Sequence, residues 1–130
     1  MTNSNRLYVE FNQQFQVNET NRVYVCFFKM AVYVDEAHTI ITKTDHDFMK
    51  LGLEMKKLFP NRQEAHLPER NRRQSDMMKY GEERLKTFEN YILDLIKTGE
   101  FIVPCLLDFL EVPATQRSKL VMNDFGVTRQ

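Results

Sequence analysis

The sequence has few of the residues that mark specialised scaffolds: no tryptophan, two cysteines, four glycines and four prolines among 130 residues. Two cysteines are too few for a disulfide framework, and so little glycine and proline argues against a collagen-like or low-complexity chain. No apolar run approaches the ~20 residues of a membrane-spanning helix. The chain also has no net charge, because 18 basic residues balance 18 acidic ones. We therefore expect one cytoplasmic globular domain without long-range attraction to nucleic acid, in which any anion site is local.

Catalytic and metal-binding patterns are missing too. The three histidines show no ligand spacing with one another or with the cysteines, and there is no glycine-rich phosphate loop or nucleophile elbow. Cys26 and Cys105 lie far apart inside apolar runs, which indicates buried reduced thiols, with a disulfide or a nucleophilic thiol as alternatives. The sequence thus predicts a protein that is not an enzyme and needs no metal or other cofactor.

The first third of the chain follows the period of two that is typical of strands. Apolar and polar side chains alternate over residues 7–17, and a dense β-branched and aromatic run over residues 23–34 predicts a strand buried on both faces. A third strand is expected over residues 39–44. The connections at 18–21 and 35–38 are short and polar, so the three strands should form an antiparallel meander.

The period then changes to that of a helix. Apolar residues recur at helical spacing from Phe48 to Leu58, Thr44 or Asp45 is a suitable N-cap, and Pro60 stops the helix. These signals predict one helix between the last strand and the proline.

A second helix is expected from Asp76, another suitable N-cap, to about Ile96, with Gly99 near its C-terminus. Gly81 is an interior weak point at which this helix starts or bends. Residues 105–110 predict a short closing helix.

Strands followed by helices predict an α+β fold, with a three-stranded antiparallel sheet packed against a small helical subdomain. The domain should span residues 5–112, and the polar residues 113–130 should form a flexible tail.

The stretch between the two long helices is a predicted loop with a local excess of positive charge. Residues 50–73 contain seven basic and three acidic side chains, a net charge of +4 in a neutral protein. Two interpretations stay open, a solvated loop and helix face or a surface that meets an anionic membrane. The basic residues are Lys50, Lys56, Lys57, Arg62, Arg70, Arg72 and Arg73.

Four short motifs occur in order along the second half of the chain. They are Asp47-Phe48 with Leu51, Phe59-Pro60, Leu67-Pro68, and Arg84 followed by Phe88 and Tyr91-Ile92. Together with the predicted elements between Leu7 and Leu110, they resemble a phox-homology (PX) domain of the sorting-nexin type. Each motif is weak alone, and the specificity lies in their order and spacing.

The resemblance implies a site for a phosphoinositide headgroup. Arg70 takes the place of the basic residue that contacts the lipid 1-phosphate, and Arg84 that of the arginine that contacts inositol hydroxyls. The family's Arg-Arg-Tyr motif, whose second arginine contacts the 3-phosphate, falls on Lys43, Thr44 and Asp45. Lys43 keeps a charge and is the third candidate headgroup contact, although it is offset by one residue, which turns it to the other face of the strand. Asp45 would repel a polyanionic headgroup. The motif is therefore degenerate.

A membrane-contacting surface beside that site is also implied. Arg72, Arg73 and Lys79 would add non-specific attraction to an anionic bilayer. Met77 and Met78 are either residues that insert into the bilayer or filler of the core.

The resemblance implies a phosphoinositide-binding module that recruits its owner to endosomal or vesicular membranes in protein trafficking, with weakened or altered recognition of phosphatidylinositol 3-phosphate. The alternative is a PX scaffold that has lost lipid reading and binds protein partners.

Overall fold

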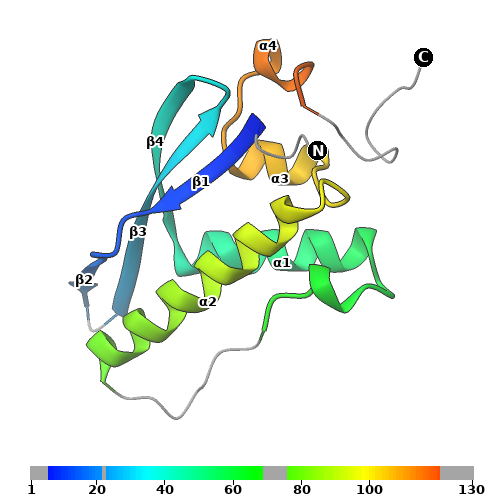
Figure 1. Ribbon diagram of the computed structural model, residues 1–130. Helices are drawn as coiled ribbons and strands as arrows, with labels where there is room; N and C mark the ends of the chain where they lie inside the picture. The colour runs from blue at the N-terminus through cyan, green and yellow to red at the C-terminus, as the bar shows by residue number, and fades with distance from the viewer. Residues whose placement is uncertain (1–5, 22, 69–75, 121–130) are drawn as a thin grey trace.

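The chain is an α+β domain in which helices cover one face of an open four-stranded antiparallel sheet (Figure 1). The computed structural model describes residues 6–21, 23–68 and 76–120. The predicted fold class is confirmed at this level. Two details of the sheet differ from the sequence-based expectation.

The first difference is that the predicted first strand is two strands. β1 (Leu7–Phe11) and β2 (Gln16–Thr20) pair with successive stretches of β3 (Val23–Val34), and β4 (Ala37–Thr44) pairs with β3 as well. Between β1 and β2 the side chain of Asn12 accepts a hydrogen bond from the Gln14 backbone N–H at 2.8 Å, which turns the chain out of the ladder.

The second difference is that β3 is buried on one face only. Cys26, Phe28 and Met30 are buried under the helices, whereas the alternate Lys29 is exposed. The sequence was misleading here because the outward positions are apolar too. Tyr33, for example, stacks on His38 of β4 with ring centroids 5.1 Å apart and lies 6.1 Å from the ring of Tyr8 on β1.

Two long helices form most of the helical layer. α1 (Asp45–Leu58) begins directly after β4, and α2 (Met77–Lys97) begins at Asp76, whose carboxylate accepts hydrogen bonds from the backbone N–H groups of Met78 and Lys79. α2 runs through Gly81 without a break. That glycine is buried, and the Phe15 ring lies directly on it.

The described part of the chain also contains three shorter helices: η2 (Gln63–Ala65), α3 (Pro104–Phe109) and α4 (Ala114–Arg117). α4 and the residues up to 120, the described part of the expected tail, contact the rest of the domain. Arg117 donates a hydrogen bond to the Val112 carbonyl at 2.9 Å and pairs with Asp108, and Leu120 is buried. The remainder of that predicted tail, residues 121–130, lies outside the described residues.

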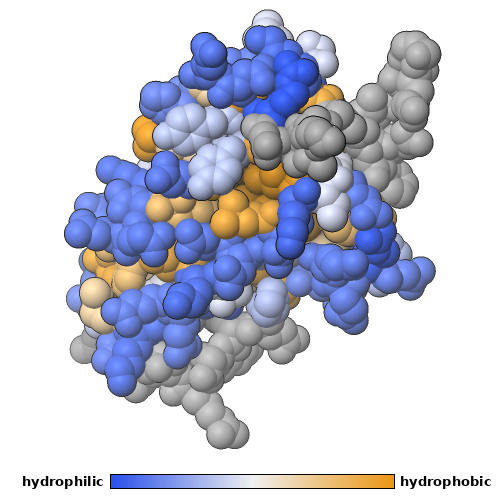
Figure 2. Space-filling model, viewed as in Figure 1, coloured by the Kyte–Doolittle hydropathy of each residue, from blue (hydrophilic) through white to orange (hydrophobic). Residues whose placement is uncertain are grey.

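The core lies between the sheet and the helices and is rich in phenylalanine. The ring of Phe88 on α2 stacks on that of Phe48 on α1 with centroids 4.0 Å apart, and meets Phe28 of β3 edge-on at 5.3 Å. All three side chains are fully buried. Figure 2 shows a mostly hydrophilic face in which apolar residues gather along the seam between the sheet and α2. Over the described ranges, no helix is both long enough and apolar enough to span a bilayer.

Candidate functional site

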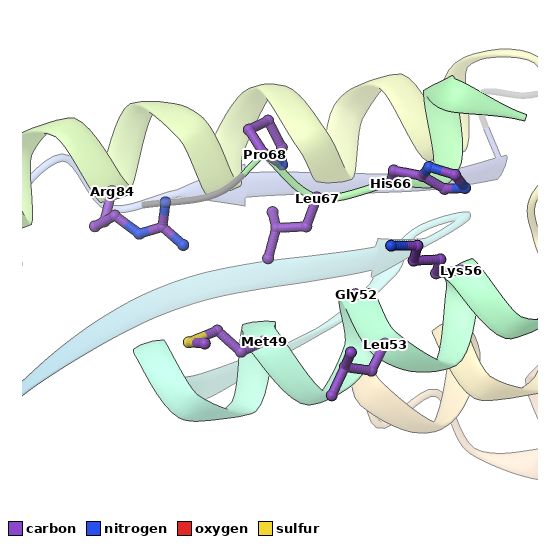
Figure 3. A pocket seen from close by; sticks show the side chains of 8 residues that line it. All are labelled: Met49, Gly52, Leu53, Lys56, His66, Leu67, Pro68 and Arg84. Carbon is purple, nitrogen blue, oxygen red and sulfur yellow. The ribbon is translucent and has the colours of Figure 1, made fainter. Parts of the chain in front are cut away.

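A cavity of about 280 Å³ lies between α1, α2 and the short segment 66–68 that follows η2 (Figure 3). Most of its wall is apolar, and the charged groups are few and separated. This is the composition of a small ligand pocket with a few orienting polar groups. Its lining residues are Met49, Gly52, Leu53, Lys56, His66, Leu67, Pro68 and Arg84.

Contacts with both long helices hold the segment 66–68 beside α1. A Cβ atom at Gly52 would lie 2.9 Å from the Cβ of Leu67, so a glycine in α1 is what allows this close approach. The Nε2 of His66 lies 3.0 Å from the Phe59 carbonyl oxygen, and the Tyr91 hydroxyl of α2 donates a hydrogen bond to the Ala65 carbonyl at 2.7 Å. These contacts fix the position of the cavity wall in the folded domain.

Arg84 is the charged group that distinguishes this cavity. Only 4% of the residue is exposed, and its guanidinium lies over the Phe88 ring at 4.5 Å. Its Nε atom forms an ion pair with Oδ1 of Asp45 at 3.6 Å, which is too long for a good hydrogen bond. This Nε atom has no hydrogen-bond partner in the described part of the chain. Figure 3 shows the side chain projecting from α2 into the space above Met49. A guanidinium that lines a cavity suits a ligand that supplies acceptor oxygens.

Asp45 provides the opposite charge at the start of α1. Its Oδ2 accepts a hydrogen bond from the Tyr80 hydroxyl, and Tyr80 lies one helical turn before Arg84 on α2. The Asp45 side chain is 15% exposed. Asp45, Tyr80 and Arg84 therefore form one cluster that joins the two helices.

Lys43 does not join this cluster. It lies on the same face of β4 as the buried Ile41, and its Nζ is 3.0 Å from Glu111 and 5.0 Å from the centre of the Phe109 ring. It lines a separate cavity of about 390 Å³ between α1 and α3. Lys43, a predicted headgroup contact, therefore lines a different cavity from Arg84.

No protein-family model and no curated protein matches this chain.

The predicted membrane-contacting residues fall into three groups. Arg72 and Arg73 lie outside the described residues, as does Arg70, the predicted headgroup contact. Met77 packs against the core, which favours the structural role weighed for it above. Met78 is 56% exposed and Lys79 is exposed, so these two positions remain available for a surface contact.

Arg62 belongs to the basic stretch by sequence, but its charge is matched within the fold. It pairs with Glu100 through both terminal nitrogens and with Glu64 at 3.3 Å, and it lies over the Phe101 ring. The neighbouring guanidinium holds the pKa of the Glu64 and Glu100 carboxyls below their ordinary value. The net charge of +4 counted over residues 50–73 is therefore larger than the net charge of the folded surface. Glu100, which pairs with Arg62, lies outside that stretch of sequence and was not counted.

The described residues contain no cluster of three histidine, cysteine or acidic side chains that could hold a metal ion. Both cysteines are free thiols. Burial is the main cause that raises the pKa of both, and for Cys105, which also feels the negative charges of Glu54 and Asp108, the pKa is about 11. Neither thiol has the depressed pKa of a nucleophile.

Alkylation of Cys105 by iodoacetamide is expected to be slow near neutral pH and to accelerate about tenfold per pH unit up to its pKa of about 11. The sign follows because a raised pKa leaves less thiolate, the reactive form, at any lower pH. Mass spectrometry of the native chain between pH 7 and 10 measures the rate. The urea-unfolded chain is the control, and its rate should level off near the ordinary thiol pKa of 9.0. A native rate that levels off there too would contradict the expectation.

Proposed function

We propose that this chain is a PX-like module that recruits its owner to endosomal or vesicular membranes by binding an inositol-type anionic headgroup in the cavity between α1 and α2. The observation that carries the proposal is Arg84, a nine-tenths buried guanidinium that lines this cavity and lies over the Phe88 ring. A planar fork of N–H donors matches phosphate oxygens and vicinal hydroxyls in geometry.

Other groups of the cavity fit the same ligand class. Lys56 supplies a second positive charge toward the other end of α1. Met49 and Leu53 are apolar and exposed at the rim, where they would meet the apolar part of a lipid or the bilayer edge. The order of the sequence motifs and the arrangement of sheet and helices agree with the resemblance stated above.

Co-sedimentation with phosphatidylcholine vesicles that carry phosphatidylinositol or one of its phosphorylated forms tests the proposal. We expect the wild-type chain to bind at least one inositol lipid, and Arg84→Ala to weaken that binding by about 10- to 100-fold, the equivalent of one charge-assisted contact. Arg84→Lys keeps the charge but loses the fork, and should weaken binding as well. The matched control is Arg6→Ala, which removes an exposed guanidinium that pairs with Asp35 and should leave binding unchanged.

Circular dichroism of each variant establishes that it is folded at the assay temperature. Wild-type binding no stronger than that to phosphatidylcholine alone, even at low salt, would overturn the proposal.

A second candidate is the PX-like scaffold that binds a protein partner instead of a lipid. The observation that favours it is the carboxylate of Asp45 beside Arg84, where a polyanionic headgroup would be repelled. If a chain carrying both Arg84→Ala and Arg70→Ala still reached vesicular membranes in cells, protein contacts would carry the recruitment.

A further inference from the structure

The described wall of the cavity between α1 and α2 contains cationic and imidazole side chains but no carboxylate. Lys56, His66 and Arg84 all line it. Figure 3 shows Arg84 at one end, above Met49, and Lys56 with His66 at the other. Met49 and Lys56 lie about 10 Å apart along the axis of α1, so the two ends are separate. Each end therefore offers a ligand its own charge.

The Arg84 end carries little net charge. The guanidinium forms an ion pair with the Asp45 carboxylate, with Nε 3.6 Å from Oδ1, so its charge is largely balanced within the fold. A guanidinium has further N–H donors, from which hydroxyl oxygens or a singly charged phosphodiester can accept hydrogen bonds. This end therefore suits the uncharged or singly charged part of a headgroup.

The Lys56 end carries a charge that the fold does not balance. Lys56 forms no ion pair with any residue that the structure describes. Beside it, His66 is held by the Phe59 carbonyl oxygen, which lies 3.0 Å from Nε2. A carbonyl oxygen only accepts hydrogen bonds, so we assign the proton of the neutral ring to Nε2. Nδ1 is then the atom that is left for a ligand, since it has no hydrogen-bond partner in the described ranges.

A phosphate monoester fits the Lys56 end better than a phosphodiester does. The monoester carries roughly two negative charges near neutral pH, and the proton that it exchanges at about pH 6 can be shared with Nδ1 of His66. A diester has no such proton. The lysine ammonium supplies donors for the phosphate oxygens. The Lys56 end therefore suits a phosphate on the inositol ring.

The place of the family's phosphate-binding arginine offers no comparable group. Thr44 stands there, and its hydroxyl accepts from the Asp47 backbone N–H at 3.2 Å. The Asp47 carboxylate in turn accepts from the Thr44 backbone N–H at 2.9 Å. This capping box uses both backbone groups, although an open helix N-terminus would attract phosphate. A ring phosphate must therefore bind elsewhere in the cavity.

We propose that Lys56 and His66 form a subsite for a phosphate monoester on the inositol ring, at the end of the cavity opposite Arg84. The inference rests on the proposed function and names its ligand: a phosphatidylinositol that carries a ring phosphate, or the same chemistry in a free inositol phosphate. A volume of about 280 Å³ is at the small end of ligand pockets and suits one such ring. Lys56 on α1 then supplies the charge that the resemblance assigns to an arginine at the position of Thr44.

The test compares phosphatidylcholine vesicles that contain phosphatidylinositol or one of its monophosphorylated forms, with phosphatidylserine added so that all vesicles carry equal charge. We expect at least one monophosphorylated form to bind about tenfold more tightly than phosphatidylinositol, the effect of one charge-assisted contact. Lys56→Gln should abolish this preference and change affinity for phosphatidylinositol less than about threefold. The matched control is Lys57→Gln, which removes the same charge from an exposed neighbour outside the cavity and should leave the preference intact.

The soluble headgroup of the preferred lipid, an inositol bisphosphate, separates the two sources of the ligand and should displace the wild-type chain from the vesicles. Tighter binding to the vesicles than to the soluble headgroup assigns the subsite to a lipid, equal binding assigns it to a free inositol phosphate, and both support it. Equal binding of phosphatidylinositol and all its monophosphorylated forms would overturn the inference, as would equal effects of Lys56→Gln and Lys57→Gln. Binding that depends on Arg84 but not on Lys56 would overturn this inference alone, whereas absence of binding to every inositol lipid would overturn the proposed function as well.

Discussion

Replacement of Phe88 by alanine is expected to lower the free energy of unfolding by about 4 kcal/mol, as judged from large-to-small substitutions in cores. The side chain is fully buried and is the contact shared by both long helices and the sheet, because its ring stacks on Phe48 and meets Phe28 edge-on. Truncation leaves a cavity that three different elements would have to close. Urea denaturation followed by circular dichroism measures the loss.

Phe88→Leu is the variant that separates folding from ligand binding. Leucine fills much of the volume, so the loss of stability should be about 1.5 kcal/mol or less. It also removes the aromatic face under the Arg84 guanidinium, a contact worth roughly 0.5–2 kcal/mol. A folded Phe88→Leu chain with weakened headgroup binding would thus link the core to the cavity. A loss below about 1 kcal/mol for Phe88→Ala would contradict the role of this ring as the centre of the core.

Replacement of Gly81 by alanine should destabilise the domain by about 2 kcal/mol, although alanine is the better helix former by roughly 1 kcal/mol. A Cβ atom at this position would lie 2.1 Å from Cε2 and 2.4 Å from Cζ of Phe15, so the ring must leave its site. Phe15 also packs near Phe28 with ring centroids 5.9 Å apart, and that contact would be disturbed. Overpacking therefore outweighs helix propensity.

The control is the same substitution in a chain that already carries Phe15→Ala. Without the ring, Gly81→Ala should become neutral or stabilise the domain by up to about 1 kcal/mol, because only the helix propensity remains. Urea denaturation of the wild-type chain, the two single variants and the double variant measures this coupling. The same destabilisation in both backgrounds would show that Phe15 is not the cause.

Local signals in the sequence located the helices well, and one local signal misled. Thr44, Pro60 and Asp76 bound α1 and α2 because caps and breakers act through neighbouring backbone groups. The sequence predicts that α2 starts or bends at Gly81. The structure shows that a glycine is needed there because the Phe15 ring, far along the chain, leaves no room for a Cβ atom. Propensity alone has no access to that contact.

The candidate site was only half predictable for a related reason. The motif pattern singled out Arg84 and grouped Lys43 with it as a headgroup contact, whereas the structure pairs Lys43 with Glu111 and Arg84 with Asp45. The pairing of Asp45 with Tyr80 and Arg84 joins the start of one helix to the start of another, and Arg62 with Glu100 spans a similar separation. Such pairs arise from tertiary packing, and no local periodicity encodes them.

The central position of β3 determines how the domain can come apart. Every strand pair of the described sheet includes β3, with β1 and β2 following one another along one side of it and β4 along the other. No two strands would stay hydrogen-bonded if β3 left, and the buried face of β3 carries Phe28, which touches both Phe48 and Phe88. Loss of β3 therefore disrupts the sheet and the core together. We expect unfolding to be a single cooperative transition, in which a substitution at any one of these contacts lowers the stability of the whole domain.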